Sequence, residues 1–146
     1  MKIAIFKENP QAILPHYSTP DSAGADIYAL LDEEKERVIL PGETYLCHTG
    51  LRMAIPSGYV GLIYARSGLA TKQGLAPANK VGVVDADYRG EVMVALHNHS
   101  AEPRTIHYGD RIAQLVIAPV VQGEFEECST LPDTTRGAGG FGSTGI

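Results

Sequence analysis

Turn residues interrupt this chain about every ten residues, and the segments between them are short and apolar. The interruptions are chemically specific, such as Pro41-Gly42, Arg89-Gly90 and Gly109-Asp110, which favour tight reversals of the backbone. Strands at this spacing are typical of sandwiches, jelly rolls and barrels, whereas a βαβ fold needs amphipathic helices between its strands. The sequence therefore predicts an all-β, jelly-roll-like sandwich or barrel of short strands, at residues 2–6, 37–40, 44–48, 51–55, 59–64, 81–84, 92–97 and 112–118.

Helical signals are weak, and we expect at most one short helix. Residues 67–73 could form a turn or two before Gly74 ends the helix. Residues 32–37 are charged, but they are too few for a stable helix and lack an apolar stripe, so we expect an exposed loop or hairpin end. We expect a single β domain over residues 1–135, followed by a flexible, glycine-rich lid segment over residues 136–146 of the same domain.

The charge and composition exclude several classes of protein. The formal net charge is −5 and the 12 Lys and Arg residues are scattered along the chain, which argues against binding to polymeric nucleic acid. A small anion remains possible, because a few local donors and a divalent cation can outweigh an unfavourable global charge. There is no apolar run of membrane-spanning length, no signal-peptide pattern, and no cysteine framework in the two cysteines. We therefore expect a cytoplasmic protein without a membrane partner.

Residues 85–91, DADYRGE, lie between two expected strands. One interpretation is a plain hairpin turn, since Asp and Gly tolerate turn conformations. The other is a catalytic carboxylate, Asp85, at the end of a strand, where it can accept a proton, with the Tyr88 ring available to stack on a sugar or base. The segment by itself does not decide between them.

Two further kinds of segment offer polar groups near strands. Residues 64–70, YARSGLA, offer the Arg66 guanidinium, the Ser67 hydroxyl and the amide of Gly68 to phosphate oxygens, although they could also be an ordinary helix start capped by Ser67. The segments SAGADIYA and GDRIAQLV place Asp26 and Gln114 inside apolar strands. A single polar residue in a strand is usually a satisfied structural one.

The glycine-rich tail is not a P-loop, because Ser143 stands where the P-loop lysine belongs and no helix can follow. Such tails are commonly disordered. This one nevertheless carries a cation, a ring and two hydroxyls, at Arg136, Phe141, Ser143 and Thr144, which suit a lid that closes over a nucleotide.

Taken in order, five segments resemble the five motifs of the homotrimeric dUTP pyrophosphatase (dUTP diphosphatase) family: SAGADIYA, ARSGLA, NKVGVVDADYRGE, GDRIAQLV and RGAGGFGSTG. The resemblance runs from Ser22 to Gly145. It departs from the family in Ala65, where many members carry proline, and in residues 32–37, which match no motif. The resemblance implies hydrolysis of dUTP to dUMP and pyrophosphate, which removes dUTP from the nucleotide pool and supplies dUMP for thymidylate synthesis.

The resemblance also implies a role for each matching residue. Asp85 would orient or deprotonate the water that attacks the α-phosphorus, and Tyr88 would pack under the deoxyribose. Asn79 and the backbone of Val83, Val84 and Met93 would read the uracil edge. The phosphates would be held by Arg66, Ser67, Gly68 and Gln114, and Asp26 would touch Mg²⁺ through water. The lid would consist of Arg136, Phe141, Gly142, Ser143 and Thr144, and three subunits would share each site.

Three other functions remain open at this stage. A dCTP deaminase or a bifunctional deaminase–pyrophosphatase has a similar fold and would release ammonia from dCTP. A nucleotide-sensing module would use the same pocket without turnover, although it would not need a general base at Asp85. A purely structural jelly-roll protein would leave the polar residues of the tail unexplained.

Overall fold

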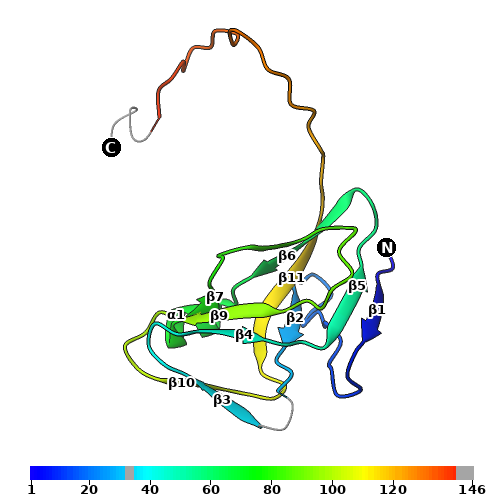
Figure 1. Ribbon diagram of the computed structural model, residues 1–146, viewed down its shortest axis with the longest axis vertical. Helices are drawn as coiled ribbons and strands as arrows, with labels where there is room; N and C mark the ends of the chain where they lie inside the picture. The colour runs from blue at the N-terminus through cyan, green and yellow to red at the C-terminus, as the bar shows by residue number, and fades with distance from the viewer. Residues whose placement is uncertain (32–34, 141–146) are drawn as a thin grey trace.

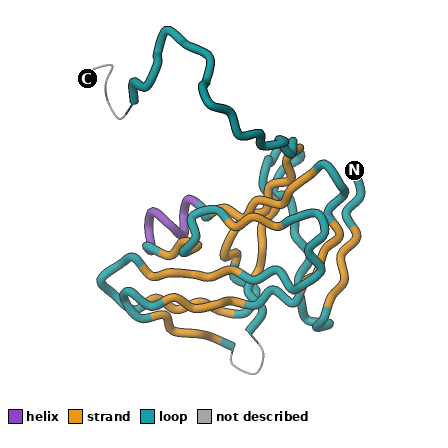
Figure 2. The backbone as a smooth tube through the Cα atoms, turned by 45° about the horizontal axis from the view of Figure 1, so that its top comes forward, coloured by secondary structure: helices purple, strands orange, loops and turns teal. Residues whose placement is uncertain are grey.

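The computed structural model describes residues 1–31 and 35–140, which form antiparallel β-sheets, one short helix and a long C-terminal extension (Figures 1 and 2). The strands of the two larger sheets are β2 (Ala25–Tyr28), β11 (Arg111–Pro119), β6 (Tyr59–Tyr64) and β8 (Gly82–Val84), then β4 (Thr44–Cys47), β9 (Val94–Asn98) and β7 (Leu75–Pro77). The two-stranded sheets pair β1 (Ala4–Lys7) with β5 (Leu51–Ala54) and β10 (Arg104–His107) with β3 (Glu36–Ile39). This arrangement confirms the expected all-β fold.

The core lies between the sheets and comes from alternating strand positions. In β9, Val94, Leu96 and Asn98 are buried while Ala95 and His97 are half-exposed, as the sequence alternation predicts. The largest fully buried apolar side chains come from strands of all four sheets: Ile27, Ile39, Leu51, Leu75, Leu96, Ile106 and Ile112.

The single helix in the described chain, α1 (Ser67–Gln73), follows β6 and has the extent that the sequence predicts. It ends because Gly74 adopts a left-handed conformation, with φ 70°, in which its amide bonds back to Ala70 and Leu69. At the other end Arg66 is the capping residue, and no side chain caps the helix. Ser67 is therefore the first helical residue and not the cap.

The prediction of a loop over residues 32–37 is wrong at Glu36 and Arg37, which belong to β3, whereas the prediction of a strand that begins at Arg37 is confirmed to within one residue. Glu36 and Arg37 pair with His107 and Ile106 of β10, a strand that shows little sequence pattern because only Ile106 in it is buried. The pairing between these distant segments overrides the local helical preference. Residues 32–34 lie outside the described part of the chain.

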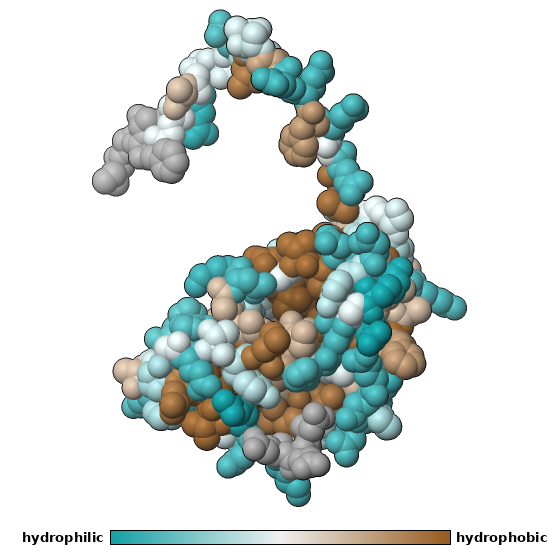
Figure 3. All heavy atoms as spheres, viewed as in Figure 1, coloured by the Kyte–Doolittle hydropathy of each residue, from teal (hydrophilic) through white to brown (hydrophobic). Residues whose placement is uncertain are grey.

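Beyond β11 the chain leaves the body as an extended segment (Figures 1 and 3). Its apolar side chains are open to solvent: Val121 is 92% exposed, Phe125 99% and Leu131 81%. Within the described residues, no helix has the length and apolar character required to span a membrane.

Candidate active site

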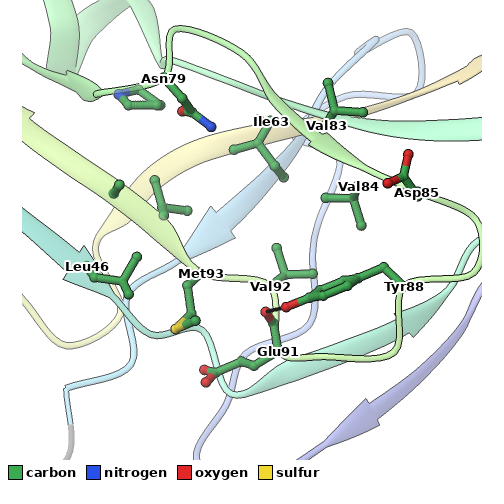
Figure 4. Close-up of a pocket in the computed structure, with 14 residues that line it drawn as sticks. Leu46, Ile63, Asn79, Val83, Val84, Asp85, Tyr88, Glu91, Val92 and Met93 are labelled. Atoms are coloured by element: carbon green, nitrogen blue, oxygen red, sulfur yellow. Dashed lines mark hydrogen bonds between the residues drawn. The ribbon is translucent and has the colours of Figure 1, made fainter.

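A pocket of about 300 Å³ lies between β8 and the residues leading into β9 (Figure 4). Most of the residues expected to read the base and sugar line it: Asn79, Val83, Val84, Asp85, Tyr88 and Met93. Its remaining walls are mainly apolar and come from neighbouring strands: Leu46, Ile63, Pro77, Gly82, Val92, Val94 and Ala95, with Glu91. The sequence therefore predicted which segment forms a concave site.

The two sides of this pocket do not pair with each other. β8 pairs through one edge with β6, where Val83 lies opposite Leu62, and residues 91–93 are outside any strand. The free edge of β8 can therefore present backbone groups to a ligand, whereas on the other side the Val92 amide and carbonyl already bond Leu51 and Thr49. Close packing also shapes the wall: a Cβ on Gly82 would lie 3.2 Å from the Ile63 Cβ and 3.4 Å from the Asn79 Nδ2.

The turn between β8 and β9 presents Asp85 and Tyr88 to the pocket. The Tyr88 amide donates to the Asp85 carbonyl over 3.2 Å, and the Arg89 Nη1 donates to the Ala86 carbonyl over 2.7 Å. The Asp85 side chain is exposed and accepts no hydrogen bond from the described residues. Its carboxylate is thus free to accept a hydrogen bond from a water molecule.

The Tyr88 ring lies over Gly90. A Cβ on Gly90 would collide with the Tyr88 hydroxyl and would lie 2.5 Å from the ring carbon Cζ. The hydroxyl donates to the Glu91 carbonyl oxygen over 3.0 Å, and 43% of the residue stays exposed (Figure 4). One face of the ring is therefore supported by backbone while the residue remains accessible to a ligand.

Glu91 is a pocket residue to which the sequence analysis assigned no role. Burial alone would raise the pKa of its carboxyl. Hydrogen bonds from His48 and from the amides of Gly50 and Thr49, with the charge of His48, instead hold that pKa below its ordinary value. Its position as the last residue of DADYRGE was the only available signal.

A second pocket, of about 330 Å³, contains the residues expected to hold phosphate. Its lining includes every one of them: Arg66, Ser67, Gly68 and Gln114. Asp26, which was expected to touch Mg²⁺ through water, lines the same pocket, together with Ser18, Ser22, Ala23 and Gly24. A Cβ on Gly68 would meet nothing within 4 Å, so packing does not require glycine there. The Gln114 Nε2 donates to the Ala65 carbonyl over 2.9 Å, which fixes its side chain across the ends of β6 and β11.

Asp26 organises this second pocket. It is 7% exposed, and its Oδ1 accepts from the Arg66 Nε over 2.8 Å. Its Oδ2 accepts from the Ser18 Oγ over 3.1 Å and from the Arg111 Nη1 over 3.3 Å. Arg66 also donates through Nη1 to the Arg111 carbonyl over 3.4 Å, and no described residue bonds its Nη2. That nitrogen can serve an anion.

The structure does not bring all the expected site residues together. The two pockets have no lining residue in common, so Asp85 and Arg66 belong to separate cavities of one chain. Arg136 lies on the extension, where its Nε bonds the Gly139 carbonyl over 2.8 Å. Phe141, Gly142, Ser143 and Thr144 fall outside the described residues.

Comparison with known proteins identifies the family. The dUTPase family model matches residues 10–145. The chain belongs to the dUTPase family. It is 50% identical to the deoxyuridine 5′-triphosphate nucleotidohydrolase of Desulfitobacterium hafniense, over 100% of this chain and 96% of that one. It is also 50% identical to the protein of the same name from Nautilia profundicola, over 99% of each chain.

A solved dUTPase has the same fold. A mutant dUTPase of Staphylococcus bacteriophage 80alpha, with dUpNHpp, superposes with a TM-score of 0.87 at 26% identity, over 99% of each chain. In the present dUTPase-family chain, Asp85 and Tyr88 lie in the pocket between β8 and β9, and Asp26, Arg66 and Gln114 lie in the second pocket. Among the described residues, no group of three or more His, Cys, Asp or Glu could hold a metal ion by itself.

Proposed function

We propose that this chain hydrolyses dUTP to dUMP and pyrophosphate, in a site shared between subunits of a homotrimer. The observation that carries the proposal is the placement of Asp85 and Tyr88 on one turn, at a pocket bordered by the free backbone edge of β8. Family membership supports the same reaction. In the cytoplasm this activity removes dUTP from the nucleotide pool and supplies dUMP for thymidylate synthesis.

In this proposal the first pocket takes the nucleoside. Uracil lies between the backbone of Val83 and Val84 on one side and Met93 on the other, with the Asn79 amide at its edge. Cytosine presents a donor where uracil presents an acceptor, so it leaves buried groups unpaired. Thymine differs by one methyl group, which in an apolar pocket is worth only about 1–3 kcal/mol, so a tight backbone wall has to contribute to its rejection.

The same turn supplies the chemistry. Tyr88 packs against the deoxyribose, where a ribose 2′-hydroxyl would meet the ring. Asp85 orients a water molecule for attack on the α-phosphorus and accepts its proton as the new P–O bond forms and the bond to the bridging oxygen breaks. The bridging oxygen leaves with the pyrophosphate.

The second pocket holds the phosphates in this proposal. The Arg66 Nη2, the Ser67 hydroxyl and the first amides of α1 are donors of the type that phosphate oxygens accept. Gln114 holds the backbone that precedes Arg66 in place, through its hydrogen bond to the Ala65 carbonyl. Donors already held in place stabilise the charge that develops on the leaving group.

The residues present fit a magnesium ion that arrives with the triphosphate. Mg²⁺ usually keeps several waters and binds through one or two carboxylates and substrate phosphates, and no described acidic cluster forms a cage for it. Both Asp26 oxygens already accept hydrogen bonds, so Asp26 would act through the water shell. When bound, Mg²⁺ would neutralise charge on the phosphate oxygens.

The separation of the two pockets supports sharing between subunits. A nucleotide in the first pocket of one chain needs phosphate donors that this chain holds in another cavity. A neighbouring copy can supply them, and closed symmetric trimers repeat such a contact three times. The extension exposes Val121, Phe125 and Leu131, which a neighbouring subunit would cover, and its last residues, 136–146, would close over the nucleotide as a lid.

Product analysis tests the reaction. The protein is incubated with Mg²⁺ and, separately, with dUTP, dCTP, dTTP and UTP. We expect dUMP and pyrophosphate from dUTP, with the other three nucleotides turned over far more slowly. Ammonia release from dCTP would replace the proposal with deamination, and binding of dUTP without turnover would replace it with a sensing function.

A further inference from the structure

We propose that Glu91 is a positioning residue that holds the Tyr88 ring in place and thereby sets the preference for deoxyribose over ribose. The inference rests on the proposed function, in which Tyr88 packs against the sugar. It assigns no chemical step to Glu91. The argument comes from the contacts that support the ring and from the contacts that fix that support.

The ring rests on the backbone of residues 90 and 91. The Tyr88 hydroxyl donates to the Glu91 carbonyl, 3.0 Å away, and the ring occupies the space that any side chain at Gly90 would need (Figure 4). The position of the ring therefore follows the position of this short piece of backbone. If residues 90 and 91 move, the ring moves with them.

That backbone is anchored to the connection between β4 and β5. The Glu91 Oε1 accepts from the Gly50 amide over 2.7 Å and from the Thr49 amide over 3.1 Å, and the Oε2 lies 2.8 Å from the His48 Nδ1. Hydrogen bonds that involve an ionised carboxylate are among the stronger ones in proteins. The adjacent residue, Val92, is bonded to the same connection through its amide and the Leu51 carbonyl, 2.8 Å apart.

The Glu91 side chain adds to the two bonds that hold the Val92 backbone, because the other side of the pocket gives no support. Residues 91–93 do not pair with β8 in the described structure, so strand hydrogen bonds do not fix them there. A ribose differs from a deoxyribose by one hydroxyl, and a ring excludes that hydroxyl by overlap only if it cannot move aside. Loss of the Glu91 anchor should therefore reduce sugar discrimination more than it reduces dUTP turnover.

Steady-state kinetics with dUTP and UTP test the inference in the wild type, Glu91→Ala and Glu91→Gln. We expect Glu91→Ala to lower the dUTP-to-UTP ratio of kcat/KM by about tenfold, as expected for the loss of a tightly held contact. Glu91→Gln should retain most of the ratio, because its amide oxygen can still accept from Gly50 and Thr49. Equal losses for both nucleotides, or an unchanged ratio in Glu91→Ala, would overturn the inference.

Glu43→Ala is the matched control. The Glu43 carboxylate also accepts a backbone amide, from Leu40 over 2.8 Å, and a side-chain donor, from Arg37 over 2.9 Å, but it does not line the pocket. We expect its dUTP-to-UTP ratio to match the wild type. A similar drop in this variant would mean that general loosening changes the ratio, and the specific role of Glu91 would be rejected.

A second measurement does not depend on activity. Protein labelled with 3-fluorotyrosine gives a ¹⁹F resonance for Tyr88, which is assigned by its disappearance in Tyr88→Phe. We expect this resonance to shift towards the solvent value in Glu91→Ala and to stay in place in Glu43→Ala. An unmoved resonance in Glu91→Ala overturns the inference alone, whereas a wild type that does not prefer dUTP overturns the proposed sugar selectivity together with the inference that rests on it.

Discussion

Asp26 and Arg66 are joined by a hydrogen bond of 2.8 Å between the buried carboxylate Oδ1 and the guanidinium Nε. The outer nitrogens of Arg66 form no hydrogen bond with Asp26 in the described structure. One of them bonds the Arg111 carbonyl, and the other has no partner among the described residues. Asp26 thus orients the arginine that we propose to bind phosphate.

Asp26→Asn should weaken both the fold and the binding of dUTP. The amide keeps one acceptor, but it removes the charge that faces Arg66 and Arg111 in a largely buried position. We expect the free energy of unfolding to fall by about 1.5–3 kcal/mol, as for lost hydrogen bonds to charged groups. KM for dUTP should rise more than kcat falls.

Urea denaturation and steady-state kinetics measure these two effects. Asp21→Asn is the control, because Asp21 lies in the turn that precedes β2 and is exposed. If Asp26→Asn binds dUTP as tightly as this control, Asp26 does not orient Arg66 for the substrate.

Asp85→Asn should retain dUTP binding and lose turnover. Its carboxylate is exposed and has no partner in the described chain that the substitution would disrupt, so folding should be unaffected. Loss of a general base lowers kcat by about 10²–10⁴-fold. Calorimetric titration with dUTP and a pyrophosphate-release assay separate binding from turnover, with Asp133→Asn as the exposed control. Near-normal turnover would remove Asp85 from its proposed role.

Mixing two inactive variants tests whether sites are shared between subunits. Asp85→Asn lacks the base of the first pocket, and Arg66→Gln lacks a phosphate donor of the second. If a site takes Asp85 from one chain and Arg66 from another, equal co-expression should restore about a quarter of the wild-type activity. The chain that supplies Asp85 carries the intact aspartate in half of the cases, and the chain that supplies Arg66 independently carries the intact arginine in half of the cases. Activity that stays at the level of the separate variants would place both residues in one chain's own site.

Much of the fold could be predicted from the sequence, because most strands carry local alternation and Gly74 marks the end of the helix. β10 and Glu36 of β3 could not, since Glu36 and His107 are polar and lie in strands only because they pair with each other. β7 was also missed, because its three residues are too few for a periodic pattern.

Some residues of the candidate site could likewise be predicted from the sequence, and others could not. Asp85, Tyr88 and Arg66 were selected by residue type and by motif, and each lies in a pocket. Glu91 and Arg111 were missed because their roles come from contacts with residues 43 and 85 positions away. Local sequence carries no signal for such contacts. The separation of the two pockets is likewise a property of the folded chain.

Removal of residues 136–146 should leave a folded protein with severe catalytic loss. Of these residues, those that the structure describes form hydrogen bonds only within the extension: the Arg136 side chain bonds Gly139, and the Gly137 amide bonds Thr134. The core should therefore keep its stability, whereas the proposed lid over the nucleotide is lost. Thermal denaturation measures the stability of the truncated protein, analytical ultracentrifugation its oligomeric state, and dUTP kinetics its activity. If the truncated chain unfolds or separates into monomers, the segment is architectural and not a lid.

Glu91 should make stability depend on pH in a defined direction. Its pKa in the folded protein is held below the ordinary value of 4.5, so the folded state binds a proton there less readily than the unfolded state does. The stabilisation is therefore fully present above pH 4.5 and is lost as the pH falls through the lowered pKa. Protonation removes the charge that accepts from Gly50, Thr49 and His48, which loosens the connection between β4 and β5.

Urea midpoints of the wild type and Glu91→Gln, measured from pH 7 down to pH 3, test this linkage. We expect the wild type to be the more stable at neutral pH and the difference to shrink as the pH falls below 4.5. Glu36→Gln is the control, because the Glu36 carboxylate is exposed on the two-stranded sheet of β3 and β10. A difference that is constant over the whole range would show that the ionised form of Glu91 contributes nothing to the anchor.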